Sequence, residues 1–160
     1  MSSTPLPEPG QPVADFTAAS TAGQFRLSEA RGSIVVLYFY PKDSTPGCTT
    51  ESRDFAAAQA HFAGAGAIIV GVSRDSLASH EKFRAKFELP FHLLSDPQEA
   101  LCTAFGVMKQ KNMYGKMVRG IERSTFLIDA AGVLRQQWRG VKVPGHVDEV
   151  LQAVQALAAH

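Results

Sequence analysis

The sequence predicts a single α/β domain in which a mixed central β-sheet is flanked by helices. The first observation is the continuous run of β-branched and aromatic residues Ile34–Tyr40, which is typical of a central strand buried on both faces. Second, short apolar runs alternate with segments of helical spacing after this strand. Third, the length of 160 residues fits one compact domain, so 1–160 are expected to form a single unit.

The elements of the first half follow from local patterns. Residues 1–12 are rich in proline, which lacks a backbone donor and resists helix, so they predict an extended amino-terminal arm. Phe16–Ala18 and Gln24–Leu27 flank a Thr-Ala-Gly turn and predict a small hairpin. After the buried strand, apolar residues recur at helical spacing over Cys48–Phe62, and Ala67–Val72 reads as the next strand.

The second half continues the alternation. Ser76–Phe87 predicts a helix and Phe91–Leu94 a strand. Asp96–Phe105 predicts a further short helix, with Pro97 suited to its first turn.

The carboxyl-terminal region predicts a hairpin and a last helix. Thr125–Ile128 and Val133–Trp138 alternate around the turn sequence Asp-Ala-Ala-Gly. Val147–Leu157 is amphipathic, with its apolar residues on one stripe.

Composition and charge exclude several classes of function. Sixteen Lys and Arg against fifteen Asp and Glu give a net charge of +1, which argues against a nucleic-acid or membrane partner and favours a small substrate. The longest apolar run, Ile34–Tyr40, is far shorter than the roughly 20 residues that a membrane-spanning helix needs. Met1–Gln11 lacks the basic start and apolar core of a secretory signal, so a cytoplasmic location is expected.

The sequence motifs leave cysteine chemistry as the main candidate for the function of the protein. Gly64–Gly66 precedes a strand rather than following one, which disfavours a dinucleotide site, and no Walker A pattern occurs. The two cysteines form no C-x-x-C pair and have no histidine at metal-ligand spacing, so neither a metal nor an organic cofactor is expected. Any special role of a cysteine must then rest on reactivity.

Cys48 occupies the position where such reactivity is expected. Its segment joins the buried strand to the first long helix, with Thr45 as a good N-cap and Pro46 suited to the first helical position. Cys48 then lies in the first turn, where unpaired N–H groups and the helix dipole favour thiolate over thiol. The alternative is a small buried hydrophobe, but a turn of Thr, Pro and Gly at a strand end is a poor place for one.

The same residues resemble a known family. Pro41, Thr45 and Cys48 reproduce the P-x-x-x-T-x-x-C signature of peroxiredoxins. The surrounding Tyr-Pro-Lys, Thr-Pro-Gly-Cys-Thr and Glu51 resemble the peroxiredoxin Q, or bacterioferritin comigratory protein, group. Glu122–Ile128 and other segments fall in the family order, so the similarity extends over nearly the whole chain.

This resemblance implies a thioredoxin-like fold, a monomer or weak dimer, and a peroxidase that reduces hydrogen peroxide and organic hydroperoxides through a sulfenic acid. Cys48 would be the peroxidatic cysteine, Thr45 a hydroxyl that hydrogen-bonds the peroxide, Pro41 a shield over the thiolate, and Arg123 the guanidinium beside it. Each partner also has a plainer interpretation. Thr45 can be only a helix cap, Pro41 can simply end the strand, and Arg123 can be a solvated arginine.

The sequence departs from the family where a second, resolving cysteine is often found. Arg53 stands five residues after Cys48, and the predicted helix Ser76–Phe87 contains Arg84 but no cysteine. The only other thiol, Cys102, lies beside an apolar stripe and is expected to be a core residue. We therefore expect a one-cysteine cycle resolved by an external thiol (thioredoxin, glutaredoxin or glutathione), with an internal disulfide to Cys102 as the alternative.

Two other classes and several residues remain to be weighed. A thiol-disulfide oxidoreductase would need a paired cysteine, whereas a non-enzymatic redox sensor stays open.

Glu51, one turn from Cys48, either holds a surrounding hydrogen bond or is an ordinary first-turn acid. A basic stretch could attract anionic reductants, but the favoured interpretation is a solvated loop; it contains Lys109, Lys111, Lys116 and Arg119. The histidines show no ligand spacing and are interpreted as surface or packing residues: His61, His80, His92, His146 and His160.

Overall fold

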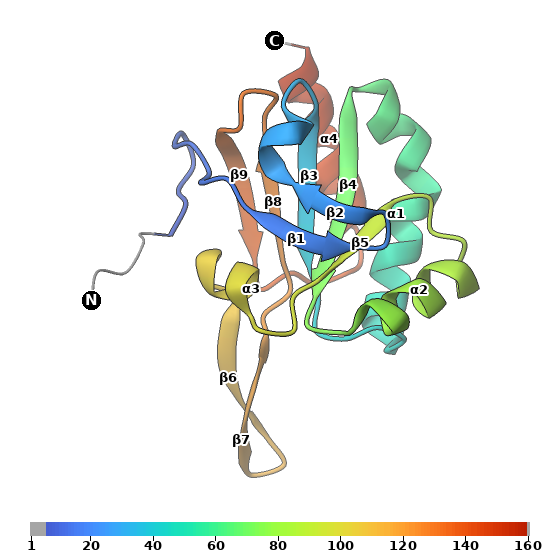
Figure 1. Ribbon diagram of the computed structural model, residues 1–160, viewed down its shortest axis with the longest axis vertical. Coiled ribbons are helices and arrows are strands. Elements are labelled where there is room, and N and C mark those ends of the chain that lie inside the picture. Colours follow the sequence, from blue (N-terminus) through green and yellow to red (C-terminus); the bar gives the residue numbers. More distant parts are fainter. Residues whose placement is uncertain (1–5, 160) are drawn as a thin grey trace.

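The computed structural model describes residues 6–159 and is built around a seven-stranded sheet of order β2-β1-β5-β4-β3-β8-β9 (Figure 1). Three parallel strands form its centre, namely β3 (Ile34–Phe39), β4 (Ala67–Ser73) and β5 (His92–Ser95). On the other side of β3, β8 (Ser124–Ile128) and β9 (Leu134–Arg139) add antiparallel strands. The sheet is mixed, as the sequence predicts.

The amino-terminal region completes the other edge. β1 (Thr17–Ser20) and β2 (Gly23–Arg26) form the predicted hairpin with slightly shifted bounds, and the 3-10 helix η1 (Leu27–Ala30) leads into β3. Before this hairpin, the chain runs beside the start of β9, where the Gly10 N–H donates to the Leu134 carbonyl across 2.7 Å. Residues 1–5 of the predicted arm lie outside the described part of the chain.

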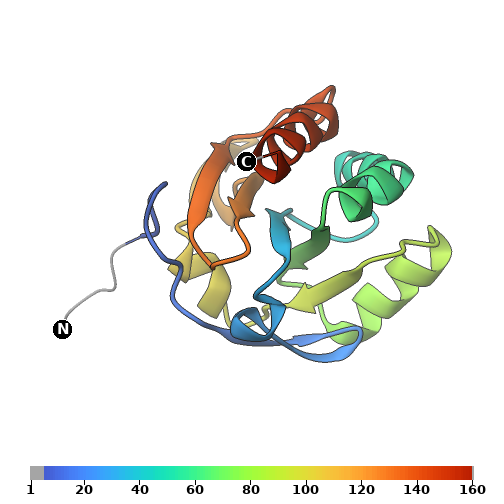
Figure 2. The same ribbon diagram turned by 90° about the horizontal axis from the view of Figure 1, so that it is seen from above.

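Two apolar layers cover the two faces of the sheet (Figure 2). On one face lie α1 (Pro46–Gly64), α2 (Leu77–Lys86) and α4 (His146–Ala158). On the other face lie η1 and the short helix α3 (Ala100–Ala104). Successive side chains of β3 alternate between the layers, so all six of its residues are buried. This explains why β3 lacks a polar face.

The predicted helix over Asp96–Phe105 is wrong in its first half. The observed α3 begins at Ala100, because the Asp96 carboxylate accepts the backbone N–H groups of Leu101 and Cys102 at 3.1 and 2.8 Å. The chain reaches this helix through Glu99, whose φ is 63°. Pro97 therefore lies in the preceding turn rather than in a helical turn.

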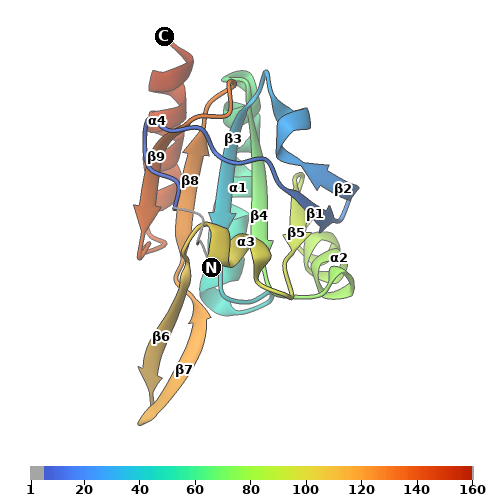
Figure 3. The same cartoon turned by 60° about the vertical axis from the view of Figure 1, so that its left-hand side comes forward.

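The interpretation of the basic stretch as a loop is also wrong. β6 (Met108–Met113) and β7 (Lys116–Ile121) pair as an antiparallel hairpin that is separate from the main sheet. It projects beyond the rest of the molecule at the end where α1 begins (Figures 1 and 3). Most of its residues are exposed on both faces, so the apolar alternation that marks a half-buried strand is absent.

Candidate active site

Cys48 lies where the sequence places it, in the first turn of α1 just past the carboxyl end of β3. The helix begins at Pro46, and the Thr49 N–H donates to the Thr45 carbonyl across 2.9 Å. The backbone N–H groups of the first turn have no partner within a helix, so this end of α1 carries partial positive charge. The Cys48 side chain is only 1% exposed and belongs to the apolar layer between the sheet and α1.

Arg123 brings a full positive charge to the sulfur. It lies between β7 and β8, and its Nη2 donates to Sγ of Cys48 across 3.3 Å. Its Nη1 donates to Oε1 of Glu51 across 2.6 Å. The guanidinium is thus held by two contacts, and its side chain is 15% exposed. The surface-arginine alternative does not describe this position.

Glu51 is the acid that orients Arg123, and it is not an ordinary first-turn surface acid. It is fully buried, and its Oε2 has no hydrogen-bond partner among residues 6–159. Burial raises the pKa of Glu51 to about 7, although Arg123 acts in the opposite direction. Burial by itself lowers the pKa of the Arg123 guanidinium, but the neighbouring Glu51 and Cys48 raise it, and the net pKa lies above its usual value. The cation therefore stays charged beside the sulfur.

Gly47 leaves room for this arrangement. A Cβ atom added to Gly47 would lie 3.2 Å from Nη2 of Arg123, the same nitrogen that contacts Cys48. Such a contact is tighter than most, so the guanidinium would have to move by a few tenths of an ångström. The residue before the cysteine is therefore constrained by the arginine.

Thr45 and Pro41 lie on the loop that leads from β3 to Cys48. Thr45 occupies the N-cap position, but the expected capping hydrogen bond is absent from the described structure. Instead its Oγ1 donates to the Lys42 carbonyl across 2.8 Å. A threonine hydroxyl has one proton to donate, so Oγ1 of Thr45 is left with acceptor lone pairs. Pro41 is half-buried, two residues beyond the end of β3.

A buried polar network anchors this loop, and sequence reasoning missed it. The Asp43 carboxylate accepts the hydroxyls of Tyr40 and Ser79 at 2.5 and 2.9 Å, and it contacts Nδ1 of His80 at 2.7 Å. Nε2 of His80 lies 2.8 Å from the Leu94 carbonyl, which can only accept, so this nitrogen carries a proton. Asp43 and His80 are 37 positions apart, so no local spacing could signal the contact.

A model of the AhpC/TSA family matches residues 9–137, which include Cys48, Glu51 and Arg123. The chain belongs to this family. It is a peroxiredoxin, a thiol-dependent peroxidase, as the resemblance in its sequence predicted.

Two relatives match this peroxiredoxin over nearly its full length. Peroxiredoxin Bcp of Xanthomonas campestris is 55% identical over 150 residues, covering 92% of this chain and 94% of the relative. Peroxiredoxin Bcp of Bacillus subtilis is 49% identical over 152 residues, covering 94% and 97% of the two chains.

Solved structures confirm the thioredoxin-like fold of this peroxiredoxin. X. campestris peroxiredoxin Q matches with a TM-score of 0.85 at 56% identity, covering 89% of this chain and 91% of that one. A variant of Xylella fastidiosa PrxQ matches with a TM-score of 0.89 at 41% identity, covering 97% and 99%. A third structure comes from work on the alkyl peroxide reduction activity of the X. campestris bacterioferritin comigratory protein, with a TM-score of 0.85, 55% identity and coverage of 89% and 92%.

The second cysteine of this peroxiredoxin lies in the other apolar layer. Cys102 is fully buried on the opposite face of the sheet from Cys48. Burial and the adjacent Asp96 carboxylate raise the pKa of the Cys102 thiol. Arginines stand at the two positions where the family resemblance would place a resolving cysteine. Arg53 is exposed on α1, and Nε of Arg84 donates to the Phe91 carbonyl across 2.9 Å.

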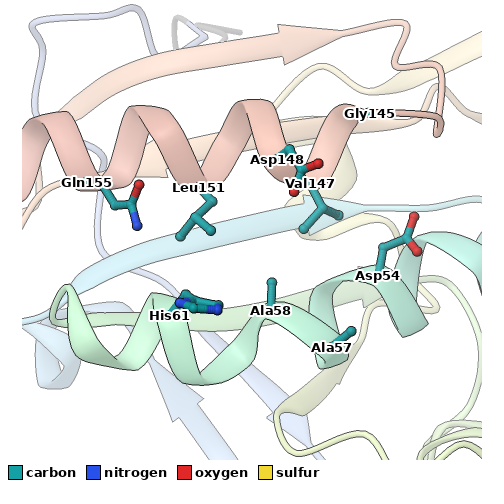
Figure 4. Close-up of a pocket in the computed structure, with 9 residues that line it drawn as sticks. All are labelled: Asp54, Ala57, Ala58, His61, Gly145, Val147, Asp148, Leu151 and Gln155. Carbon is teal, nitrogen blue, oxygen red and sulfur yellow. The ribbon is translucent and has the colours of Figure 1, made fainter.

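A sizeable cavity of this peroxiredoxin lies away from the cysteine. It has a volume of about 560 Å³ and lies between α1 and α4, with Asp54 and His61 on one helix and Asp148 and Gln155 on the other (Figure 4). None of the four predicted site residues lines it. Burial and the facing Asp148 raise the pKa of Asp54. Cavity size therefore does not locate Cys48, whose sulfur is marked instead by its charged neighbours.

Proposed function

We propose that this peroxiredoxin reduces hydrogen peroxide and organic hydroperoxides through the Cys48 thiolate, with Arg123 as the group that stabilises the reacting sulfur. The contact of 3.3 Å between Nη2 of Arg123 and Sγ of Cys48, at the start of α1, is the observation that carries this proposal. The study of alkyl peroxide reduction by the X. campestris relative supports the inclusion of organic hydroperoxides.

The chemical step transfers one oxygen atom to sulfur. The thiolate attacks the distal oxygen of the peroxide, a sulfur–oxygen bond forms, and the oxygen–oxygen bond breaks. The departing alkoxide or hydroxide takes a proton and leaves as alcohol or water, and Cys48 becomes a sulfenic acid. Negative charge moves from sulfur to the departing oxygen. Arg123 and the first-turn N–H groups of α1 remain in place along this path, so they stabilise the transition state without reorganising.

The loop residues position the peroxide. Oγ1 of Thr45 already donates its proton to Lys42, so it acts as the acceptor for the O–H of the incoming hydroperoxide. Pro41 covers the approach to the sulfur with an apolar ring that brings no competing donor. The buried Asp43 and His80 pair holds the loop that carries both residues.

The second half of the cycle uses a thiol from outside the chain. A thiol attacks the sulfenic acid, water leaves, and a mixed disulfide forms; a second thiol then releases Cys48 and carries away the disulfide. Two observations support an external thiol. The positions of Arg53 and Arg84 hold no cysteine, and Cys102 lies across the sheet from Cys48. A disulfide needs Cα atoms about 4.4–6.8 Å apart, whereas a β-sheet separates these two thiols.

Mass spectrometry of the intact protein tests this proposal. One equivalent of peroxide is added to the reduced protein and to its Cys102→Ser variant, followed by dimedone to trap sulfenic acid. We expect one dimedone adduct on Cys48 in both proteins. A loss of two hydrogen atoms that requires Cys102 would establish the internal disulfide instead. Rapid mixing with peroxide gives the rate of Cys48 oxidation. If this rate is no faster than that of free cysteine, a redox sensor is the only one of the function classes that remains.

Three broader expectations complete the proposal. We infer that the chain forms one domain, because both apolar layers share one sheet. We also infer a monomeric state and a cytoplasmic location. In the part of the chain that is described, no helix is both long and apolar enough to cross a bilayer. Sedimentation velocity on the purified protein tests the monomer.

A further inference from the structure

The β6–β7 hairpin carries an unbalanced positive charge. From Ala100 to Ile121 the sequence contains four cationic residues and no Asp or Glu. Within residues 6–159, Arg119 pairs with Glu99, whereas the three lysines form no ion pair. The charge of these lysines is therefore available to a partner.

The register places all three lysines on one face. Lys109 is paired with Gly120, Lys111 with Val118, and Lys116 with Met113. Two residues paired across the hairpin lie on the same face, and so does every second residue along each strand. Lys109, Lys111, Lys116 and Val118 therefore share one face, called here the lysine face. Arg119 lies on the other face, where it pairs with Glu99.

The lysine face also offers apolar contact. Val118 is 43% exposed on this face, and Tyr114 in the turn of the hairpin is fully exposed. The hairpin forms no part of the main sheet, and the side chains described between Lys109 and Arg119 are exposed on both of its faces. Lysines around exposed apolar side chains at a projecting tip fit a protein surface that is acidic with an apolar centre.

The hairpin is linked directly to the active site. β7 ends at Ile121, and Arg123, which contacts Cys48, follows two residues later. At about 3.3 Å per residue, the pair Lys109 and Gly120 lies within about 10 Å along the chain from Arg123, and Lys116 within about 23 Å. A standard protein interface covers about 800 Å² per partner, so one docked domain can touch the lysine face and reach the active site.

We propose that the lysine face is the docking surface for the reductant of this peroxiredoxin, and that this reductant is an acidic thiol protein. The inference rests on the proposed function, in which the resolving thiol comes from outside the chain. A small thiol such as glutathione is less suited, because the lysines extend along about 13 Å of strand and one small molecule cannot bind all of them. A protein with an acidic rim engages the whole face.

Charge-matched variants test the docking surface. The first variant is the triple substitution Lys109→Gln, Lys111→Gln and Lys116→Gln. The control, Arg26→Gln, Arg31→Gln and Arg135→Gln, removes the same charge from exposed positions away from the hairpin. The probes are a thioredoxin and a glutaredoxin of net negative charge, and peroxide turnover is measured at about 0.05 M and about 0.5 M salt.

We expect the lysine variant to lower kcat/KM for at least one acidic probe about tenfold at low salt, and the difference to vanish at high salt because screening removes the steering. The control variant should follow the unmodified protein. Equal kcat/KM in the two variants for both probes would overturn the proposal. The proposal would also be overturned if glutathione supported turnover and neither acidic probe did. A third contrary result would be a labelled DNA duplex that binds the unmodified protein more tightly than either probe and does not bind the lysine variant.

Dithiothreitol separates this proposal from the proposed function. It is small and uncharged, so it reduces the oxidised enzyme without the lysine face. If dithiothreitol supports no peroxide turnover in the unmodified protein, the proposed function fails. If dithiothreitol supports turnover in all three proteins but the acidic probes do not distinguish them, only the docking surface fails.

Discussion

The two cysteines of this protein are equally buried but have opposite surroundings. Cys48 is 1% exposed and Cys102 is fully buried, each in one of the two apolar layers of the sheet. Cys48 receives a hydrogen bond from the Arg123 guanidinium. The backbone N–H of Cys102 donates instead to the Asp96 carboxylate, which together with burial raises the pKa of its thiol. Burial is common to the two thiols, so the sign of the neighbouring charge is what distinguishes them.

The largest expected effect comes from exchanging the Cys48 sulfur for oxygen, and the same exchange at Cys102 is the comparison. Cys48→Ser should abolish peroxide turnover, because a serine hydroxyl is not ionised at neutral pH and is a poor nucleophile. Cys102→Ser should leave the rate of peroxide reduction within about threefold of the wild type. Rapid mixing with hydrogen peroxide gives both rates. A large loss in Cys102→Ser, with native circular dichroism, would break the distinction between the two thiols.

Removing the cation should have the next largest effect. Arg123→Ala should lower the second-order rate of Cys48 oxidation about 100-fold, which is typical for the loss of a donor aimed at transition-state charge. Arg123→Lys should recover part of the rate, since it restores the charge but not both donors. The exposed Arg26 provides a matched control, and Arg26→Ala should not change the rate. An unchanged rate in Arg123→Ala would remove the basis of the proposed mechanism.

Glu51 should make stability depend on pH. Its pKa is raised from 4.5 to about 7 in the folded protein, so between these values the folded state binds a proton that the unfolded state has released. The free energy of unfolding therefore falls as pH rises through this window, by about 3 kcal/mol in total. Glu51→Gln has no such titration. Guanidinium denaturation at about pH 5 and about pH 8 should show this fall in the wild type relative to the variant.

A control and a contrary outcome define this test. Glu81 is an exposed acid on α2, so Glu81→Gln should keep the pH dependence of the wild type. If the wild type and Glu51→Gln lose the same stability between the two pH values, the folded-state titration of Glu51 is not the cause.

The smallest effect is expected at Gly47. Gly47→Ala places a methyl group 3.2 Å from Nη2 of Arg123 and displaces the guanidinium by a few tenths of an ångström. The rate of Cys48 oxidation should fall about threefold to tenfold, because donors must be held to about 0.5 Å of the productive geometry. The exposed Gly64, where an added Cβ meets nothing within 4 Å, supplies the control Gly64→Ala. A rate unchanged in Gly47→Ala would mean that the arginine tolerates this shift.

The helices and strands were predicted best where the apolar pattern is strong. β3 and the terminal helix α4 agree closely with the sequence, because β3 is a continuous apolar run buried on both faces and the buried residues of α4 recur at helical spacing. The helix before Cys102 was overpredicted. Only the folded chain brings the Asp96 carboxylate to the N–H groups of α3, and this contact sets where the helix starts.

The β6–β7 hairpin was missed for the opposite reason. The side chains described between Lys109 and Arg119 are exposed, so no apolar alternation identifies a strand. Its pairing nevertheless decides that three lysines share a face, a fact that depends on register rather than on composition.

By itself the sequence determined the mixed α/β architecture and the place of Cys48 at the start of a helix, because both depend on neighbours along the chain. The family resemblance named Arg123 as the guanidinium beside the thiolate, but only the tertiary structure gave the contact itself and added the buried Glu51 to it. Arg123 reaches Cys48 from 75 positions away, and Glu51 becomes fully buried beside it. Charge at a buried sulfur depends on distance in space, and that distance is set when strands far apart in sequence pair in one sheet.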